Sequence, residues 1–143
     1  MGKIHVIVAD FNSEITSQLL QGAIAGLAAK DFPSKSIIVS HVPGAFELPI
    51  AALFAGQQFA TDAVICLGAV IRGETSHYDY VCSETARGIM DVGLKLQKPV
   101  IFGVLTTENE AQAEARSKPD STNKGFECAL AALSMIKTLK SLR

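Results

Sequence analysis

The feature that most constrains the fold is an apolar run near the middle of the chain, AVICLGAVI at residues 63–71. A nearly continuous run of this kind predicts a strand that is covered on both faces, as in a parallel sheet. The run passes directly into a polar stretch, RGETSH at residues 72–77. Because ligands of open parallel sheets bind beyond the carboxyl ends of the strands, a site is expected at this polar stretch.

Hydrophobic periodicity predicts the other elements of the fold. Further strands are expected at residues 3–8, 36–42 and 100–105, and helices at residues 15–29, 47–56, 77–96, 109–116 and 122–142. Strands that alternate with helices are typical of βαβ units with right-handed crossovers. The sequence therefore predicts one domain, residues 1–143, of the α/β class: a three-layer α/β/α sandwich of flavodoxin-like type around a four-stranded parallel sheet.

Composition and charge argue against several classes of protein. Hydrophobic residues make up 48% of the chain and charged residues 19%, as in ordinary globular proteins. A net charge of −1 gives no electrostatic footprint for nucleic acid, and no apolar run reaches the ~18 residues that span a bilayer. The start of the chain does not resemble a secretory signal, so a cytoplasmic protein is expected. The three cysteines (Cys66, Cys82 and Cys128) are odd in number and widely spaced, which predicts reduced thiols and no zinc site.

The polar stretch after the central strand has the residues for anion binding and proton transfer. Gly73 is expected to allow a sharp turn, and Ser76 with Asp79 fits a capping box at the start of a helix. The N–H groups of that first turn, together with the helix dipole, favour an anion. His77 lies in the same turn, and histidine is the side chain best suited to proton transfer near neutral pH. These residues suggest chemistry on a small phosphorylated substrate, with a capped helix and an exposed histidine as the simpler interpretation.

Other candidate residues follow the remaining strands. Phe11 could stack on a planar ring or plug a loop, and Glu47 could bind ligand hydroxyls or only favour the start of a helix. Arg116 could donate two hydrogen bonds to a phosphate, although a solvated surface charge is the simpler interpretation. His5 and His41 lie within predicted strands and are expected to be structural. The sequence contains no GxGxxG, GxxxxGK[ST] or GxSxG motif, which argues against dinucleotide binding, nucleoside triphosphate binding and serine hydrolysis.

Five motifs carry a resemblance to a known family: FN at 11–12, VPGAFELP at 42–49, GAVIRGETSHYDYV at 68–81, PVIFGVLTTENEAQAEAR at 99–116 and NKG at 123–125. In this order the sequence resembles the 6,7-dimethyl-8-ribityllumazine synthases, the penultimate enzymes of riboflavin biosynthesis. The resemblance implies a flavodoxin-like transferase that joins 5-amino-6-(D-ribitylamino)uracil to 3,4-dihydroxy-2-butanone 4-phosphate. The reaction releases phosphate and water. The resemblance implies no metal and no organic cofactor.

The resemblance also implies a role for each matching residue. His77 takes the acid–base role, and Phe11 stacks on the pyrimidine ring. The residues implied to line the pyrimidine and ribityl site are Ala45, Phe46, Glu47, Ala69, Val70, Ile71 and Phe102; those implied at the phosphate are Glu74, Thr75 and Arg116, with Lys124 and Glu127 in support.

The resemblance further implies a pentamer with sites between neighbouring subunits, in which Phe102 and Arg116 come from the adjacent chain. It also allows an association with riboflavin synthase. Met1 lies two residues before the first expected strand, and the loop at residues 116–124 carries Pro119 and no glycine. These differences from shell-forming relatives predict an isolated pentamer or a pair of pentamers. Two alternatives stay open at this point, a riboflavin synthase of the archaeal type and a flavin or lumazine carrier without catalysis.

Overall fold

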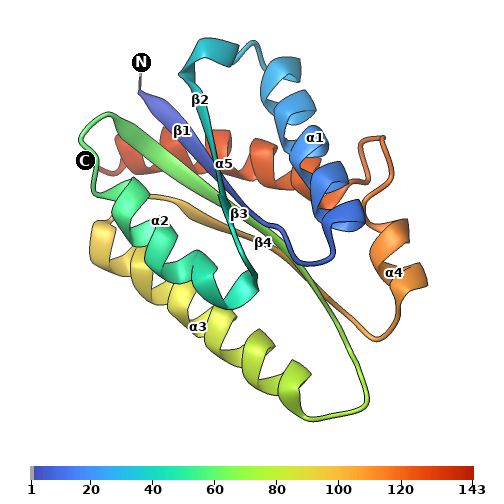
Figure 1. Ribbon diagram of the computed structural model, residues 1–143. Coiled ribbons are helices and arrows are strands. Elements are labelled where there is room, and N and C mark those ends of the chain that lie inside the picture. The colour runs from blue at the N-terminus through green and yellow to red at the C-terminus, as the bar shows by residue number, and fades with distance from the viewer. Residues whose placement is uncertain (1) are drawn as a thin grey trace.

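The computed structural model describes residues 2–143 and has a four-stranded parallel sheet between two layers of helices (Figure 1). The strands lie in the order β2-β1-β3-β4. They are β1 (Lys3–Ala9), β2 (Ile37–Val42), β3 (Thr61–Ile71) and β4 (Val100–Thr107). The helices are α1 (Ser13–Ala29), α2 (Leu48–Gly56), α3 (His77–Leu96), α4 (Glu110–Ala115) and α5 (Lys124–Ser141), with short 3₁₀ turns η1 (Ser34–Ser36) and η2 (Ala45–Glu47). The predicted fold class is confirmed.

The central position of β3 explains its continuous apolar sequence. β3 pairs with β1 on one side and with β4 on the other, so that Ile65 lies beside both Val6 and Ile101. Val6 and Ile65 are buried with the helices α1 and α5, whereas Ile7 and Cys66 are buried with α2 and α3. Figure 1 shows these two helix pairs on opposite faces of the sheet. Both faces of β3 are therefore core, as its sequence predicts.

The observed elements begin and end within two residues of the predicted ones, and the difference at β4 bears on the site. The expected strand ends at residue 105, but β4 continues through Thr107. The extension has a structural reason, because Thr106 pairs with Val70 and Thr107 with Ile71 along the neighbouring strand β3. The polar threonines are therefore part of the sheet and not a loop that follows it.

Two of the three cysteines and the two strand histidines occupy structural positions, whereas Cys82 is half-buried. Cys66 and Cys128 are buried free thiols, and burial raises the pKa of Cys66 to about 12 and that of Cys128 to about 11. His5 is buried, with Nε2 at 2.8 Å from Ser40 Oγ. His41 is exposed, and its Nδ1 lies 2.8 Å from an Asp10 carboxylate oxygen. Both histidines thus link neighbouring strands or loops.

Membrane-spanning helices and clusters of metal ligands are both absent from residues 2–143. No helix in this range combines the length and the apolar character that crossing a membrane requires. The same residues contain no group of three or more His, Cys, Asp or Glu side chains arranged to hold a metal ion.

Candidate active site

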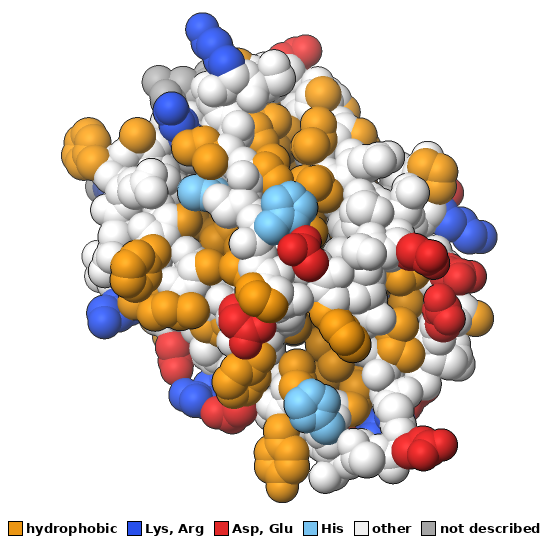
Figure 2. All heavy atoms as spheres, viewed as in Figure 1, with side chains coloured by type: hydrophobic (Ala, Val, Ile, Leu, Met, Phe, Trp, Pro, Cys, Tyr) orange, Lys and Arg blue, Asp and Glu red, His pale blue; other side chains and the backbone are white. Residues whose placement is uncertain are grey.

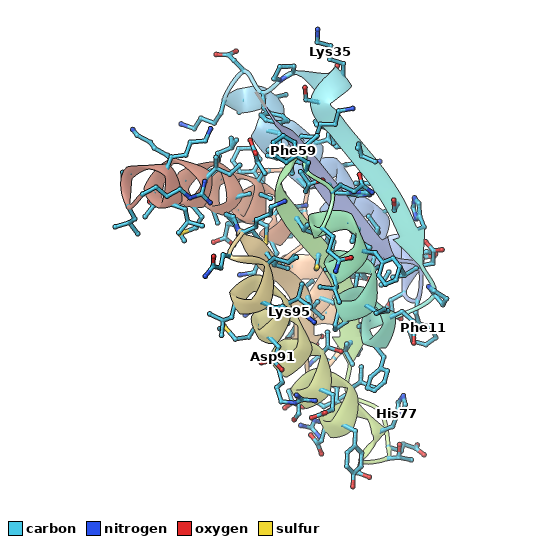
Figure 3. The ribbon with its side chains drawn as sticks, turned by 90° about the vertical axis from the view of Figure 1, so that its left-hand side faces the viewer. Phe11, Lys35, Phe59, His77, Asp91 and Lys95 are labelled. Atoms are coloured by element: carbon cyan, nitrogen blue, oxygen red, sulfur yellow. The ribbon has the colours of Figure 1, made fainter. Side chains whose placement is uncertain are left out.

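A cavity of about 780 Å³ lies at the carboxyl ends of the strands, between the loops after β1 and β2 and the start of α3. Figure 2 shows hydrophobic side chains gathered around a histidine at the lower end of this face. Figure 3 shows Phe11 and His77 toward one end of the molecule and Lys35 and Phe59 at the other. The cavity is lined by Phe11, Pro43, Gly44, Ala45, Phe46, Glu47, Ala69, Val70, Ile71, Gly73, Thr75, His77, Tyr78, Tyr80 and Val81.

The loop after β1 is held against the ends of two other strands. Asn12 has a left-handed backbone conformation (φ 62°), and its side-chain amide donates a 2.8 Å hydrogen bond to the Ala69 carbonyl at the end of β3. The backbone N–H of Phe11 donates to the Pro43 carbonyl at 3.0 Å. These bonds fix the backbone beneath the Phe11 ring, which is 72% exposed and forms one wall of the cavity. An exposed aromatic ring on a fixed backbone is suited to stacking on a planar ligand.

The loop after β2 brings a carboxylate to the cavity. The N–H of Glu47 donates to the Gly44 carbonyl at 3.2 Å and closes the turn η2. A methyl group added at Gly44 would lie 3.2 Å from Glu47 Oε1, so the carboxylate turns back beside this glycine. Glu47 therefore combines a fixed backbone with acceptor oxygens at the cavity wall, which suits it to bind ligand hydroxyl or amine groups.

The start of α3 differs from the predicted capping box. Ser76 is the N-cap, but its backbone is helical (φ −72°, ψ −2°) and its side chain accepts no capping hydrogen bond. The Ser76 carbonyl instead accepts from the N–H of Asp79 at 3.0 Å, and the N–H of His77 makes only a long contact of 3.4 Å with Thr75 Oγ1. The capping-box prediction is wrong. The consequence favours anion binding, because the Ser76 hydroxyl does not cap the first turn and the His77 N–H makes only a long contact.

Gly73 lies in the segment that connects β3 to α3, as expected, but the chain does not use a left-handed backbone conformation at this glycine. No glycine in residues 2–143 has a positive φ, and a methyl group placed at Gly73 meets no atom within 4 Å. The chain leaves β3 in an ordinary conformation, with the Arg72 N–H donating to the Thr107 carbonyl at 2.9 Å. Gly73 therefore contributes open space at the cavity, and the backbone conformation there does not require a glycine.

Sequence reasoning missed three aromatic or apolar residues of α3 that line the cavity, Tyr78, Tyr80 and Val81. They belong to the HYDYV part of the motif at residues 68–81. Their position next to His77 in that motif could have predicted that they line the same cavity. The guanidinium of Arg72 lies over the Tyr78 ring, 4.3 Å from its centre. Partial removal of the phenol from water raises the pKa of Tyr78 above its ordinary value.

The structure divides the predicted site residues into two groups. Nine line the cavity: Phe11, Ala45, Phe46, Glu47, Ala69, Val70, Ile71, Thr75 and His77. Glu74 is exposed in the same loop but is not among the lining residues, and four others lie outside the cavity: Phe102, Arg116, Lys124 and Glu127.

Phe102 belongs to a second apolar groove of about 690 Å³ along α3, β4 and α5. Arg116 follows α4, and its guanidinium donates to the Gln112 carbonyl at 3.2 Å. The N–H of Lys124 donates to the Arg116 carbonyl at 2.8 Å, which holds Arg116 close to the start of α5. Within one chain, neither Phe102 nor Arg116 lines the cavity that contains His77.

Fold and cavity together define a flavodoxin-like α/β protein with a cavity at the carboxyl ends of its parallel strands, where ligands of such folds bind. The family model of 6,7-dimethyl-8-ribityllumazine synthase matches residues 2–140 of the 143-residue chain. The chain therefore belongs to this family of transferases, which acts in riboflavin biosynthesis.

Proposed function

We propose that the protein condenses 5-amino-6-(D-ribitylamino)uracil with 3,4-dihydroxy-2-butanone 4-phosphate to give 6,7-dimethyl-8-ribityllumazine, phosphate and water. The observation that carries this proposal is one cavity in which His77, the Phe11 ring and the Glu47 carboxylate meet beside the uncapped start of α3. These groups match the needs of the two substrates: a planar ring, a polyhydroxyl chain and a phosphate.

The proposed chemistry begins when the uracil amine attacks the ketone and forms an imine with loss of water. Elimination then releases inorganic phosphate, and attack by the ribitylamino nitrogen closes the second ring with loss of another water. Each step moves a proton, and His77 is the cavity residue best suited to accept and return it. The first-turn N–H groups of α3 favour the phosphate as its negative charge increases during elimination.

We also propose that two chains form each complete site, within a pentameric ring. One flank of the chain exposes apolar side chains beside the cavity (Phe46, Ile50 and Phe54), and another exposes them around the second groove (Met90, Leu94, Met135 and Leu142). Two different apolar surfaces on one chain favour head-to-tail contacts, which close into a ring when the rotation permits. In this arrangement Phe102 and Arg116 of a neighbour complete the cavity.

The test of the activity is to mix both substrates with the purified protein and follow lumazine absorbance or fluorescence. His77→Ala is expected to lower turnover by about 10- to 10⁴-fold while pyrimidine binding is retained, because it removes the proton-transfer group. Arg116→Ala is expected mainly to raise the KM for the phosphate substrate. Arg87→Ala is the matched control, because Arg87 pairs with Glu84 and Asp91 on the exposed side of α3. Full activity of both test variants would contradict the assigned roles.

Co-expression of the two impaired variants, His77→Ala and Arg116→Ala, tests the shared site. His77→Ala chains keep Arg116, and Arg116→Ala chains keep His77. In a ring with head-to-tail sites, random assembly restores both groups in about a quarter of the sites, so activity should return. If each chain had its own complete site, the mixed rings would be no more active than the separate variants.

A further inference from the structure

The side chain of Arg72 joins two loops that lie at the end of the sheet. Arg72 is the first residue after β3, and its Nε donates a 2.5 Å hydrogen bond to the carboxylate of Glu108 in the loop between β4 and α4. Its Nη2 lies 3.4 Å from an Asp79 carboxylate oxygen in the first turn of α3. The same guanidinium lies over the ring of Tyr78. One cation therefore contacts three side chains from two other segments.

The contacts of Arg72 with α3 compensate for the missing side-chain cap. Tyr78 and Asp79 directly follow His77 in the chain. A guanidinium that contacts both of them therefore also limits the movement of His77. A planar guanidinium can combine stacking with directed hydrogen bonds, which a lysine ammonium cannot do with the same geometry. The start of α3 is thus anchored from the end of β3.

The contact of Arg72 with Glu108 continues toward Arg116. The backbone N–H of Glu108 donates to the side-chain carbonyl of Gln112 at 2.8 Å. The backbone carbonyl of Gln112 then accepts the 3.2 Å hydrogen bond from the Arg116 guanidinium. A continuous chain of polar contacts therefore runs from the first turn of α3, through Arg72, Glu108 and Gln112, to Arg116.

We propose that Arg72 is a positioning residue that holds His77 through the first turn of α3 and holds Arg116 through Glu108 and Gln112. This inference rests on the proposed function, in which the histidine and the arginine act in the same reaction. In the proposed ring, the His77 of a chain belongs to one site and its Arg116 to the next. Arg72 then links two consecutive sites within one chain.

Because the Arg72–Glu108 pair is exposed to solvent, an effect of Arg72 on catalysis can be distinguished from an effect on folding stability. The side chain of Arg72 is 40% exposed and that of Glu108 is 59% exposed. Ion pairs in contact with solvent contribute little to folding, so loss of this pair is expected to change kinetics while the unfolding midpoint stays nearly constant. A displacement of a reacting group by about 1 Å can reduce a rate by about 10²-fold, which makes kinetics the sensitive measurement.

The experiment compares Arg72→Met, Glu108→Gln and the matched control Arg87→Met. Arg87 lies in α3, the helix that Arg72 contacts, and also has two carboxylate partners, Glu84 at 2.7 Å and Asp91 at 3.1 Å. Arg72→Met is expected to lower kcat about tenfold and raise the KM for the phosphate substrate about threefold. Glu108→Gln is expected to raise that KM about threefold with kcat within about twofold, because the α3 contacts of Arg72 remain.

The control variant Arg87→Met is expected to keep both constants within about twofold of the wild type. Arg72→Lys keeps the charge but loses the planar guanidinium that stacks on Tyr78 and donates directed hydrogen bonds. It is therefore expected to recover less than half of the kcat that Arg72→Met loses. If Arg72→Met and Arg87→Met have the same kcat and KM, the inference is wrong while the proposed function stands. A wild-type protein that makes no lumazine overturns both. Should Arg72→Met fail to fold, an unchanged KM in Glu108→Gln overturns the inference by itself.

Discussion

The buried amide of Asn123 offers the sharpest test of how the two helices behind the sheet are held together. Its Oδ1 accepts hydrogen bonds from the N–H groups of Gly125 at 2.7 Å and Phe126 at 3.2 Å, which caps α5. Its Nδ2 donates to the Gln18 carbonyl of α1 at 3.1 Å and to the Lys118 carbonyl at 3.0 Å. The side chain is only 1% exposed, so water cannot replace these partners.

Asn123→Ala removes all four bonds. Loss of an N-cap costs about 1 kcal/mol, and each lost donated bond in the interior costs about the same. The expected decrease in the free energy of unfolding is therefore about 3 kcal/mol, which corresponds to a decrease in Tm of about 10 °C for a chain of this size. Asn123→Ser keeps a capping oxygen and is expected to recover about 1 kcal/mol. The assay is urea unfolding followed by circular dichroism at one fixed protein concentration.

Two controls make this prediction specific. Asn109 also caps a helix, α4, through one bond from the Gln112 N–H at 2.9 Å, but it is exposed, so Asn109→Ala should cost about 1 kcal/mol or less. A methyl group at Gly22 would lie 2.1 Å from Asn123 Oδ1, so Gly22→Ala should destabilise the wild type. In the Asn123→Ala background the same methyl group enters the vacated space and should be neutral or stabilising. Equal costs for Asn123→Ala and Asn109→Ala, or additive effects with Gly22→Ala, would refute the reasoning.

Two further predictions concern the packing of α5 and the buried histidine. Gly125→Ala should cost about 3 kcal/mol or more by urea unfolding, because its methyl group would lie 1.9 Å from the Leu19 carbonyl oxygen, whereas Gly73→Ala, with no atom within 4 Å, should cost less than about 1 kcal/mol. Burial lowers the pKa of His5, so the unfolded chain binds more protons than the folded one and stability falls as the pH decreases below about 6.5. His5→Gln should flatten this decline between about pH 7 and about pH 5.5, and an unchanged slope would assign the decline to other groups.

The order of strands and helices could be predicted from the sequence because it depends on patterns within short segments. The apolar run of β3 indicated a strand with two covered faces, and the predicted helix at residues 77–96 agrees with α3 at both ends. The alternation of the two element types then required a parallel sheet, since right-handed crossovers place successive strands in the same direction. Local chemistry was sufficient for the fold class.

The errors at the site arose where contacts between distant residues determine the local backbone. The S-x-x-D pattern at Ser76 fits a capping box, but the observed backbone at Ser76 is helical and its side chain does not cap α3. Arg72 anchors that turn instead, through partners that include Glu108, 36 residues away. Asn12 similarly supports the cavity through a bond to Ala69, 57 residues away. No pattern within a short window contains such pairs, so the sequence indicated the end of the sheet where the cavity lies but not the contacts that support it.

The distribution of exposed apolar side chains explains why a site in this protein would be divided between chains. Phe11 and Phe46 at the cavity are 72% and 57% exposed, and Leu94 and Leu142 at the other flank are 70% and 75% exposed. Burial of such surfaces is favourable by roughly 25 cal/mol per Å² of apolar area, and extended exposed patches are typical of surfaces that bind a partner. In the proposed ring one flank covers the other, and the covering chain also supplies an arginine that the cavity lacks. Assembly would then exclude water from the Phe11 ring and complete the phosphate site in the same step, so that the hydrophobic effect that forms the ring also prepares the chemistry.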